Sequence, residues 1–357
     1  MEKNAGPDHQ AEYFAWFDFL RITLALGVFA SHVGVEPFGT GHFGNACVQV
    51  FFALSGFLIG GILAKSSLAD LPRFYFNRST RIWVPYAIAI AVLFAGTATK
   101  QDLSDPKLRE FFFYKATFTY NTFGLDQLGT FIQRTPLQGT GNHFWSICVE
   151  EQFYLVAPFV IVFLGRRRLV VYLILVGLLV LNFFHPHNFT SVALGVLLAL
   201  SREAHGAWYL RSKGVALAAA TLVTAVGLGV AGVLPYTAAV PFVAVALVAL
   251  VARPHRRIAV GAWLGGLSYP FYLNHWVGLF LQKRLAALFH TGRFLTALGA
   301  FAIAFGFSAV HYRFIDSEVL RRRGRWFTTR LGIAACASGI LLVVVGLLGG
   351  LTVYGQH

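Results

Sequence analysis

Long apolar stretches, each followed by a short polar or basic segment, recur along almost the whole chain. A membrane-spanning helix needs about 20 mainly apolar residues, so this pattern predicts an all-helical, polytopic membrane bundle. We expect about eleven spans (10–11), because one stretch is short and two others are separated only by a turn at Pro235. The predicted spans are 14–34, 46–64, 82–99, 144–164, 169–185, 189–201, 214–234, 236–252, 258–281, 294–315 and 332–354.

The segment 100–143 is the one long polar interruption of this pattern. Its aromatic run at 111–114 and its glycine, threonine and asparagine residues suggest a partly folded cap, too small to be an independent domain. The chain is therefore expected to form a single integral-membrane domain, residues 1–357, without a fused soluble domain.

Composition indicates a membrane protein. Hydrophobic residues make up 57% of the 357 residues, charged residues only 12%, and the mean hydropathy is +0.64. A net charge of +14 would suggest nucleic-acid binding in a soluble protein. Here the basic residues lie in short clusters between apolar stretches, so membrane lipids are an expected partner and nucleic acid is not. The three cysteines lie in apolar segments without metal-ligand spacing, so no metal site is expected.

The distribution of basic residues predicts how the spans are oriented. Of the 29 Lys and Arg residues, 20 fall in segments on one side of the membrane, eight fall on the other side, and Arg21 lies within the first span. Basic residues concentrate in cytoplasmic loops. The N-terminus is therefore expected in the cytoplasm and His357 outside it.

Two polar side chains interrupt the first predicted span. Arg21 and His32 are eleven residues apart, so they share nearly one helix face and are separated by about 16 Å along its axis. With the N-terminus inside, Arg21 lies near the cytoplasmic surface and His32 in the outer half of the membrane. Taken alone, His32 is explained as a hydrogen-bonded packing residue. Arg21 is explained as a side chain that extends to the membrane surface.

The fourth and ninth predicted spans carry polar groups at a depth similar to that of His32. Glu150 and Glu151 lie in the outer half of the fourth span, and Asn274 and His275 lie at comparable depth in the ninth. Ionisable groups inside a bilayer cost several kcal/mol and commonly mark functional sites. Packing alone does not explain why three spans carry polar, titratable side chains at the same depth in the membrane.

Arg78 and Arg81 directly precede the third predicted span and share a helix face, because they are three residues apart. On the cytoplasmic side they agree with the usual excess of positive charge. Arginine also binds phosphate through paired N–H groups. Arg21 lies at a similar depth and would complete a pocket for phosphate.

These residues belong to an ordered set that resembles the acyltransferase-3 family of membrane O-acyltransferases. The resemblance extends over roughly residues 13–320. The set comprises Arg21 and His32 with ten residues between them, the run Phe51 to Ile59, Arg78-x-x-Arg81 with Pro85, His143 to Tyr154, and Tyr272 to Trp276. It departs from the family at Ile315-Asp316-Ser317-Glu318, where a Glu-x-Pro element is frequent.

The resemblance implies an enzyme of the bacterial inner membrane that moves an acyl group, often acetyl, from acyl-CoA to a hydroxyl of a surface or exported carbohydrate or glycolipid. It implies that His32 and Glu150 are catalytic and that Arg21, Arg78 and Arg81 serve the acyl-CoA donor. No tightly bound cofactor is expected, and acetyl-CoA is the expected co-substrate.

In this reading His32 is the general base that takes the proton of the acceptor hydroxyl, a step typically worth about 10²–10⁴-fold in rate. Glu150 would orient the His32 tautomer, as a carboxylate does in a catalytic triad. A covalent acyl-histidine intermediate is the alternative. Further candidates for contact with the acceptor or the developing oxyanion are Asn142, His143, Glu151, Asn274 and His275.

A proton-coupled transporter or flippase of a glycan or lipid is the competing function, since His and Glu within spans also build proton relays. Transporters often contain inverted repeats, and no internal repeat stands out in this sequence. A non-catalytic scaffold would leave the three polar spans unexplained.

Overall fold

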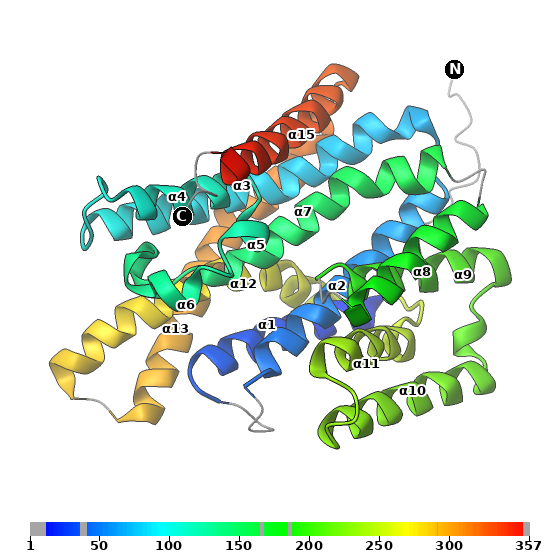
Figure 1. Ribbon diagram of the computed structural model, residues 1–357, viewed down its shortest axis with the longest axis horizontal. Coiled ribbons are helices and arrows are strands. Elements are labelled where there is room, and N and C mark those ends of the chain that lie inside the picture. Colours follow the sequence, from blue (N-terminus) through cyan, green and yellow to red (C-terminus); the bar gives the residue numbers. More distant parts are fainter. Residues whose placement is uncertain (1–11, 36–40, 165–167, 185–187, 291, 353–357) are drawn as a thin grey trace.

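Helices are the only regular elements in the part of the chain that the computed structural model describes, residues 12–35, 41–164, 168–184, 188–290 and 292–352 (Figure 1). The α-helices are α1 (Ala15–His32), α2 (Phe43–Ala64), α3 (Leu71–Ala98), α4 (Pro106–Ala116), α5 (Tyr120–Phe123), α6 (Leu128–Phe131), α7 (Trp145–Pro158), α8 (Arg168–Phe184), α9 (Thr190–His205), α10 (Ser212–Val230), α11 (Tyr236–Val251), α12 (Ala259–Phe289), α13 (Arg293–His311), α14 (Ser317–Trp326) and α15 (Thr329–Thr352). Two π-helical segments, η5 (Phe159–Phe163) and η8 (Tyr312–Asp316), continue α7 and α13.

The predicted all-helical class is confirmed, and each of the eleven predicted spans overlaps an observed helix. Six helical segments among the described residues are long and apolar enough to cross a membrane, so the chain is an integral membrane protein. The count of eleven spans is not confirmed. The 16-residue α9 is shorter than a span requires, and Asp18 and Arg21 reduce the apolar character of α1.

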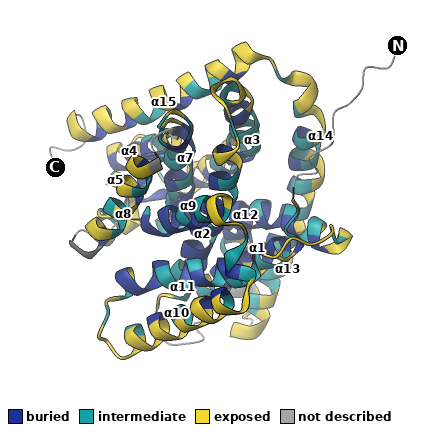
Figure 2. Ribbon diagram, turned by 90° about the vertical axis from the view of Figure 1, so that its right-hand side faces the viewer, coloured by how far each residue is buried: buried dark blue, intermediate teal, exposed yellow. Residues whose placement is uncertain are grey.

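The helices differ in how far they are buried, and this difference locates the centre of the bundle. In α2, 72% of the most apolar window is buried, compared with 17% in α10 and in α15. Figure 2 shows long exposed faces on α10 and α15. The outward faces of α10 and α15 carry exposed leucines and valines, which suits contact with lipid.

Two glycines allow α2 and α9 to pack with their backbones in close approach. A Cβ atom at Gly56 would lie 2.2 Å from the carbonyl oxygen of Val192, and one at Gly195 would lie 2.0 Å from that of Ala53. Small residues at such crossings are typical of membrane helices. Because Gly56 faces α9, its neighbour Ser55 points away from α9 and reaches α7, where Tyr154 is its partner.

The helix α12 is 31 residues long and contains Pro270 near its middle. Proline lacks an N–H group and disturbs the helical hydrogen-bond ladder. The carbonyl oxygen of Pro270 accepts bonds from Nδ2 of Asn274 at 2.9 Å and from Oγ of Ser308 at 3.4 Å. The middle of α12 is thus held by α13 on one side, while α1 packs against the other.

Residues 100–143, expected to form a cap, contain α4, α5 and α6, and 3₁₀ turns follow α6. The Tyr86 hydroxyl of α3 donates to the carbonyl oxygen of Lys115 in α4 at 2.9 Å. A buried ion pair, 2.6 Å between Lys107 and Glu110, braces the same helix. The cap ends at Gly141, whose φ of 82° favours glycine and turns the chain into the start of α7.

Candidate active site

Three histidines from three segments form a cluster at one end of the bundle, which we call the histidine end. His32 is the last residue of α1, His143 lies in the 3₁₀ turn η4 (Asn142–Phe144), and His275 lies in α12. The ring centroid of His275 is 5.0 Å from that of His32 and 4.4 Å from that of His143. His32 is exposed, whereas the other two are buried.

The hydrogen bonds of His275 determine which nitrogen of His32 lacks a proton. Nδ1 of His275 lies 2.8 Å from the carbonyl oxygen of Tyr272. Because a carbonyl can only accept, this Nδ1 carries the proton, and Nε2 of the neutral ring is an acceptor. Nδ1 of His32 lies 2.9 Å from that Nε2 and therefore donates to it. The neutral His32 ring is left with an unprotonated Nε2, as a general base requires.

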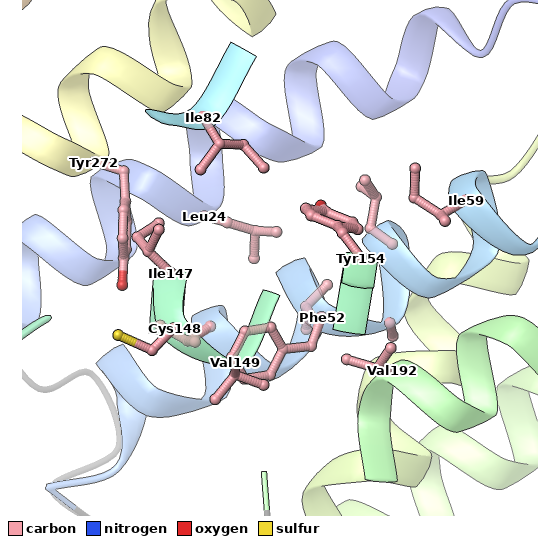
Figure 3. Close-up of a cluster of buried hydrophobic side chains, with 14 of the residues drawn as sticks. Leu24, Phe52, Ile59, Ile82, Ile147, Cys148, Val149, Tyr154, Val192 and Tyr272 are labelled. Carbon is pink, nitrogen blue, oxygen red and sulfur yellow. The ribbon is translucent and has the colours of Figure 1, made fainter. Parts of the chain in front are cut away.

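A cavity of about 240 Å³ lies inside the bundle next to the histidine end. Its lining comes from α1, α2, α3, α7 and α12 and mixes apolar side chains with charged and hydroxyl-bearing ones. Figure 3 shows part of this lining, with Tyr272 and Tyr154 on opposite sides and Ile82 and Ile147 between them.

Tyr272 and Ser146 end the cavity at the histidine cluster. The Tyr272 hydroxyl lies 2.6 Å from Oγ of Ser146 and donates to the carbonyl oxygen of His143 at 3.1 Å. Since Tyr272 and His275 are three residues apart on α12, the histidine rings lie directly beyond this hydrogen-bonded pair. His32 is reached from the exposed side and does not line the cavity.

Three arginines line the other end of the cavity, which we call the arginine end. The structure brings together Arg21 of α1 with Arg78 and Arg81 of α3, as the sequence suggested. Nη1 of Arg21 pairs with Oδ1 of Asp18 at 3.2 Å, and the guanidinium of Arg78 lies 5.6 Å from the ring centroid of Tyr154. One cavity therefore extends from a strongly cationic end to the Tyr272–Ser146 pair beside the histidine cluster.

The adjacent carboxylates of α7 point in different directions, as expected for neighbours on a helix. Glu150 lines the cavity and hydrogen-bonds with Ser55. Glu151 is 2% exposed and accepts a bond from Nε1 of Trp83 at 2.8 Å. Glu151 thus faces α3, and Glu150 is the carboxylate that a molecule in the cavity would meet.

The partner of His32 differs from the one expected. His275, rather than Glu150, occupies the position next to Nδ1 of His32. The physical reason is depth: Glu150 lies four residues beyond Ser146 along α7, about 6 Å further from the histidine end. His275 therefore occupies the position beside Nδ1 of His32 that we had expected for the carboxylate, and Glu150 lines the cavity.

The two asparagines considered for the oxyanion hydrogen-bond with other parts of the bundle. Oδ1 of Asn142 accepts a bond from the Tyr120 hydroxyl at 2.6 Å. Nδ2 of Asn274 lies 2.9 Å from Nδ1 of His311, in addition to its bond with Pro270. Asn142 thus ties the cap to the start of α7, and Asn274 ties α12 to α13.

Sequence reasoning did not assign a role to Ser55, Ser146, Tyr154 or Tyr272, which are among the polar residues that line the cavity. Oγ of Ser55 and the Tyr154 hydroxyl are 2.5 Å apart. A signal was present in α7, because Ser146, Glu150 and Tyr154 follow one another at intervals of four residues and so share one helix face.

A second polar cluster, also unexpected, lies at the junction of α13 and α14. Nε2 of His311 is 3.5 Å from Oδ2 of Asp316, and both residues are buried. They are five residues apart, and the π-helical turn of η8 stacks residues at this interval. Asp316 is the residue at which the sequence departs from the family pattern.

Within the described ranges, no group of three His, Cys, Asp or Glu side chains is arranged to hold a metal ion. The histidines of the cluster bond instead to one another and to backbone carbonyls.

Comparison with known proteins identifies a family for this chain. Residues 14–313 match the sequence profile of a family described as an acyltransferase domain. The chain is 30% identical over 175 residues to O-acetyltransferase OatA of Staphylococcus aureus (strain NCTC 8325 / PS 47), with the same values for OatA of strains COL and MRSA252. The aligned region covers 47% of this chain and 27% of these relatives. No solved structure matches the chain.

Proposed function

This chain belongs to the acyltransferase-3 family, and on that premise we propose that it is an O-acyltransferase. It transfers an acyl group, in the first place acetyl, from acyl-CoA to a hydroxyl of an exported carbohydrate or glycolipid. The observation that supports this function best is a single cavity with three arginines at one end and the Tyr272–Ser146 pair at the other, with the histidine cluster directly beyond that pair. The name O-acetyltransferase of the OatA relatives supports acetyl as the group and oxygen as the acceptor atom.

The arginine end suits the donor. Arg78 and Arg81 offer guanidinium groups, which match phosphate oxygens in charge and geometry. The pantetheine arm of acyl-CoA is a chain with amide groups, and the mixed lining of Ser146, Glu150 and apolar side chains suits it. Glu150 acts on this side of the reaction, because its carboxylate lies close enough to Arg78 and Arg81 to attract them.

His32 acts as the general base. The proton of the acceptor hydroxyl passes to Nε2 of His32, and the acceptor oxygen attacks the thioester carbonyl carbon. The tetrahedral intermediate then collapses, the C–S bond breaks, and the CoA thiolate takes the proton back from the imidazolium. His275 is a positioning residue, since it fixes the His32 tautomer and stabilises the imidazolium through the 2.9 Å hydrogen bond.

The acyl group must pass the end of the cavity to reach His32. Tyr272 and Ser146 close this end through their 2.6 Å hydrogen bond. We infer that this bond opens when a loaded donor fills the cavity, so that the thioester meets the histidine cluster only with donor in place.

The orientation follows from the positive charge of the arginine end. We propose that this end faces the cytoplasm, where acyl-CoA is made, and that the N-terminus lies on the same side of a bacterial inner membrane. His32, exposed at the opposite end, would then receive the acceptor from outside.

Transfer of label from acetyl-CoA tests the function. Purified protein in lipid nanodiscs is incubated with acetyl-CoA labelled in the acetyl group, with and without a glycan acceptor. We expect label to move to the acceptor, and His32→Ala to lower the rate by about 10²–10⁴-fold, the usual worth of a general base. The variant should still bind CoA, because the arginine end is unchanged.

Two results would contradict the proposal. If His32→Ala, still folded and still binding CoA, transfers label at the normal rate, His32 is not the base. If the unchanged protein never releases label from CoA but moves glycan across the membrane, the protein is a transporter.

A further inference from the structure

A further guanidinium lies beside the arginine end of the cavity. Arg323 of α14 is half-buried, and its Nη1 donates to the carbonyl oxygen of Asn77 at 3.3 Å. Asn77 directly precedes Arg78 on α3. The charge of Arg323 is close enough to those of Arg81 and Arg73 to interact with both.

The backbone between α13 and α14 accounts for the position of Arg323. The π-helical segment η8 inserts an extra residue into the helix, which rotates all later side chains by about 100° around the axis. On α14, Arg321 and Arg322 pair with Glu318 on the exposed side. Arg323 is instead directed to α3, next to the arginines of the cavity.

The guanidinium groups of this cluster outnumber the carboxylates near them, which are Glu150 beside Arg78 and Arg81 and Asp316 near Arg81. None of the ion pairs formed by the described residues includes Arg78, Arg81 or Arg323. Like charges held together away from bulk water repel one another. Paired guanidinium groups are also the preferred partners of phosphate in proteins. The cluster therefore fits a ligand with more than one phosphate group.

We propose that Arg323 binds the 3′-phosphate of the adenosine of acyl-CoA, while Arg78 and Arg81 bind the diphosphate. This assignment rests on the proposed acyl-CoA donor. The diphosphate is attached to the pantetheine arm, so it belongs with the two arginines that line the cavity. The 3′-phosphate is on the ribose, further from the thioester, and Arg323 lies outside the cavity beside Asn77.

The proposal predicts a specific preference between two donors. Acetyl-dephospho-CoA differs from acetyl-CoA only by lacking the 3′-phosphate. We expect the unchanged protein to bind acetyl-CoA at least about tenfold more tightly, since a hydrogen bond to a charged group is worth that factor. In Arg323→Ala the two donors should bind within about twofold of each other, and Arg323→Lys should restore part of the preference.

The matched control is Arg325→Ala, which removes an exposed arginine two residues away on the same helix. It should keep the preference for acetyl-CoA. Binding is measured by competition against labelled CoA, with the full-length protein in nanodiscs of neutral lipid and, separately, in nanodiscs that contain anionic lipid.

The possible results are distinguishable. Equal weakening of both donors in Arg323→Ala would overturn the proposal, because Arg323 would then act elsewhere on the donor. An effect of Arg323→Ala that occurs only with anionic lipid would also overturn it and would identify a lipid headgroup as the phosphate partner. If the unchanged protein binds neither donor, the proposed acyl-CoA function itself fails.

Discussion

Replacement of His275 by phenylalanine tests the orienting role of this residue. The side chain is 1% exposed, and its ring packs near those of Phe29 and Phe271. Phenylalanine keeps a ring of similar shape but removes the Nε2 lone pair that accepts from Nδ1 of His32. The His32 ring then loses its 2.9 Å hydrogen bond and is free to adopt the other tautomer.

The size of the effect can be worked out from the kind of bond that is lost. In a serine protease, loss of the carboxylate that orients the catalytic histidine lowers kcat by about 10⁴-fold. A hydrogen bond between neutral groups has about half the strength of one to a charged group. Half the free energy corresponds to a fall in kcat of about 10²-fold for His275→Phe. The donor KM should stay unchanged, because the arginine end is untouched.

Initial rates of acetyl transfer, measured over a range of acetyl-CoA concentrations, separate kcat from KM. His275→Gln should recover part of the loss, because its Oε1 can accept the bond from His32. The control is His311→Phe, the same substitution at another buried histidine, which contacts Asn274 and Asp316 and should lower stability more than kcat. A fall in kcat of less than about fivefold, or 1 kcal/mol, in a folded His275→Phe protein would refute the tautomer argument.

Two further predictions concern stability, measured by thermal unfolding in detergent. Burial lowers the pKa of Lys115 to about 7, well below its value in an unfolded chain. Above pH 7 the unfolded state therefore binds one more proton than the folded state, and the free energy of unfolding rises with pH. Between pH 7 and pH 9 we expect a gain of about 2–3 kcal/mol, which Lys115→Met should abolish; an unchanged gain would contradict this. Gly56→Ala places a Cβ 2.2 Å from the Val192 carbonyl and should cost about 1–3 kcal/mol. Gly61→Ala, with nothing within 4 Å, should cost much less, and equal losses would contradict the close approach of α2 and α9.

The fold class and the two ends of the site could be predicted from the sequence. Apolar stretches of sufficient length overlap the observed helices, because burial and backbone hydrogen bonding leave little choice inside a membrane. The spacing of Arg21 and His32 on one helix placed them at different depths on nearly one face. The common cavity of Arg21, Arg78 and Arg81 followed from equal depth on neighbouring spans.

The pairing of side chains could not be predicted in the same way. Depth along a span locates a residue only to within about a turn, or 5.4 Å, and says nothing of which helices are neighbours. His32 was therefore matched with a carboxylate at similar depth, whereas the rotation of α12 about its axis brings His275 to its Nδ1.

The π-helical segment η8 is a second limit on what the sequence could predict. It breaks the period of 3.6 residues on which predictions of helix faces depend. The contact between His311 and Asp316, and the direction of Arg323 toward α3, both follow from this interruption.

The division of the site into two ends has a physical reason that follows from the proposed reaction. Moving a phosphate-bearing nucleotide through the bilayer would cost several kcal/mol for each charge, whereas an acetyl group is neutral. The cavity of about 240 Å³ is smaller than most pockets that enclose a whole ligand, about 300–1,000 Å³. It is therefore suited to the pantetheine arm alone, with the nucleotide held outside by the arginines. Only the acyl group then needs to pass Tyr272, and the size of the acceptor is limited by the exposed surroundings of His32 rather than by the cavity.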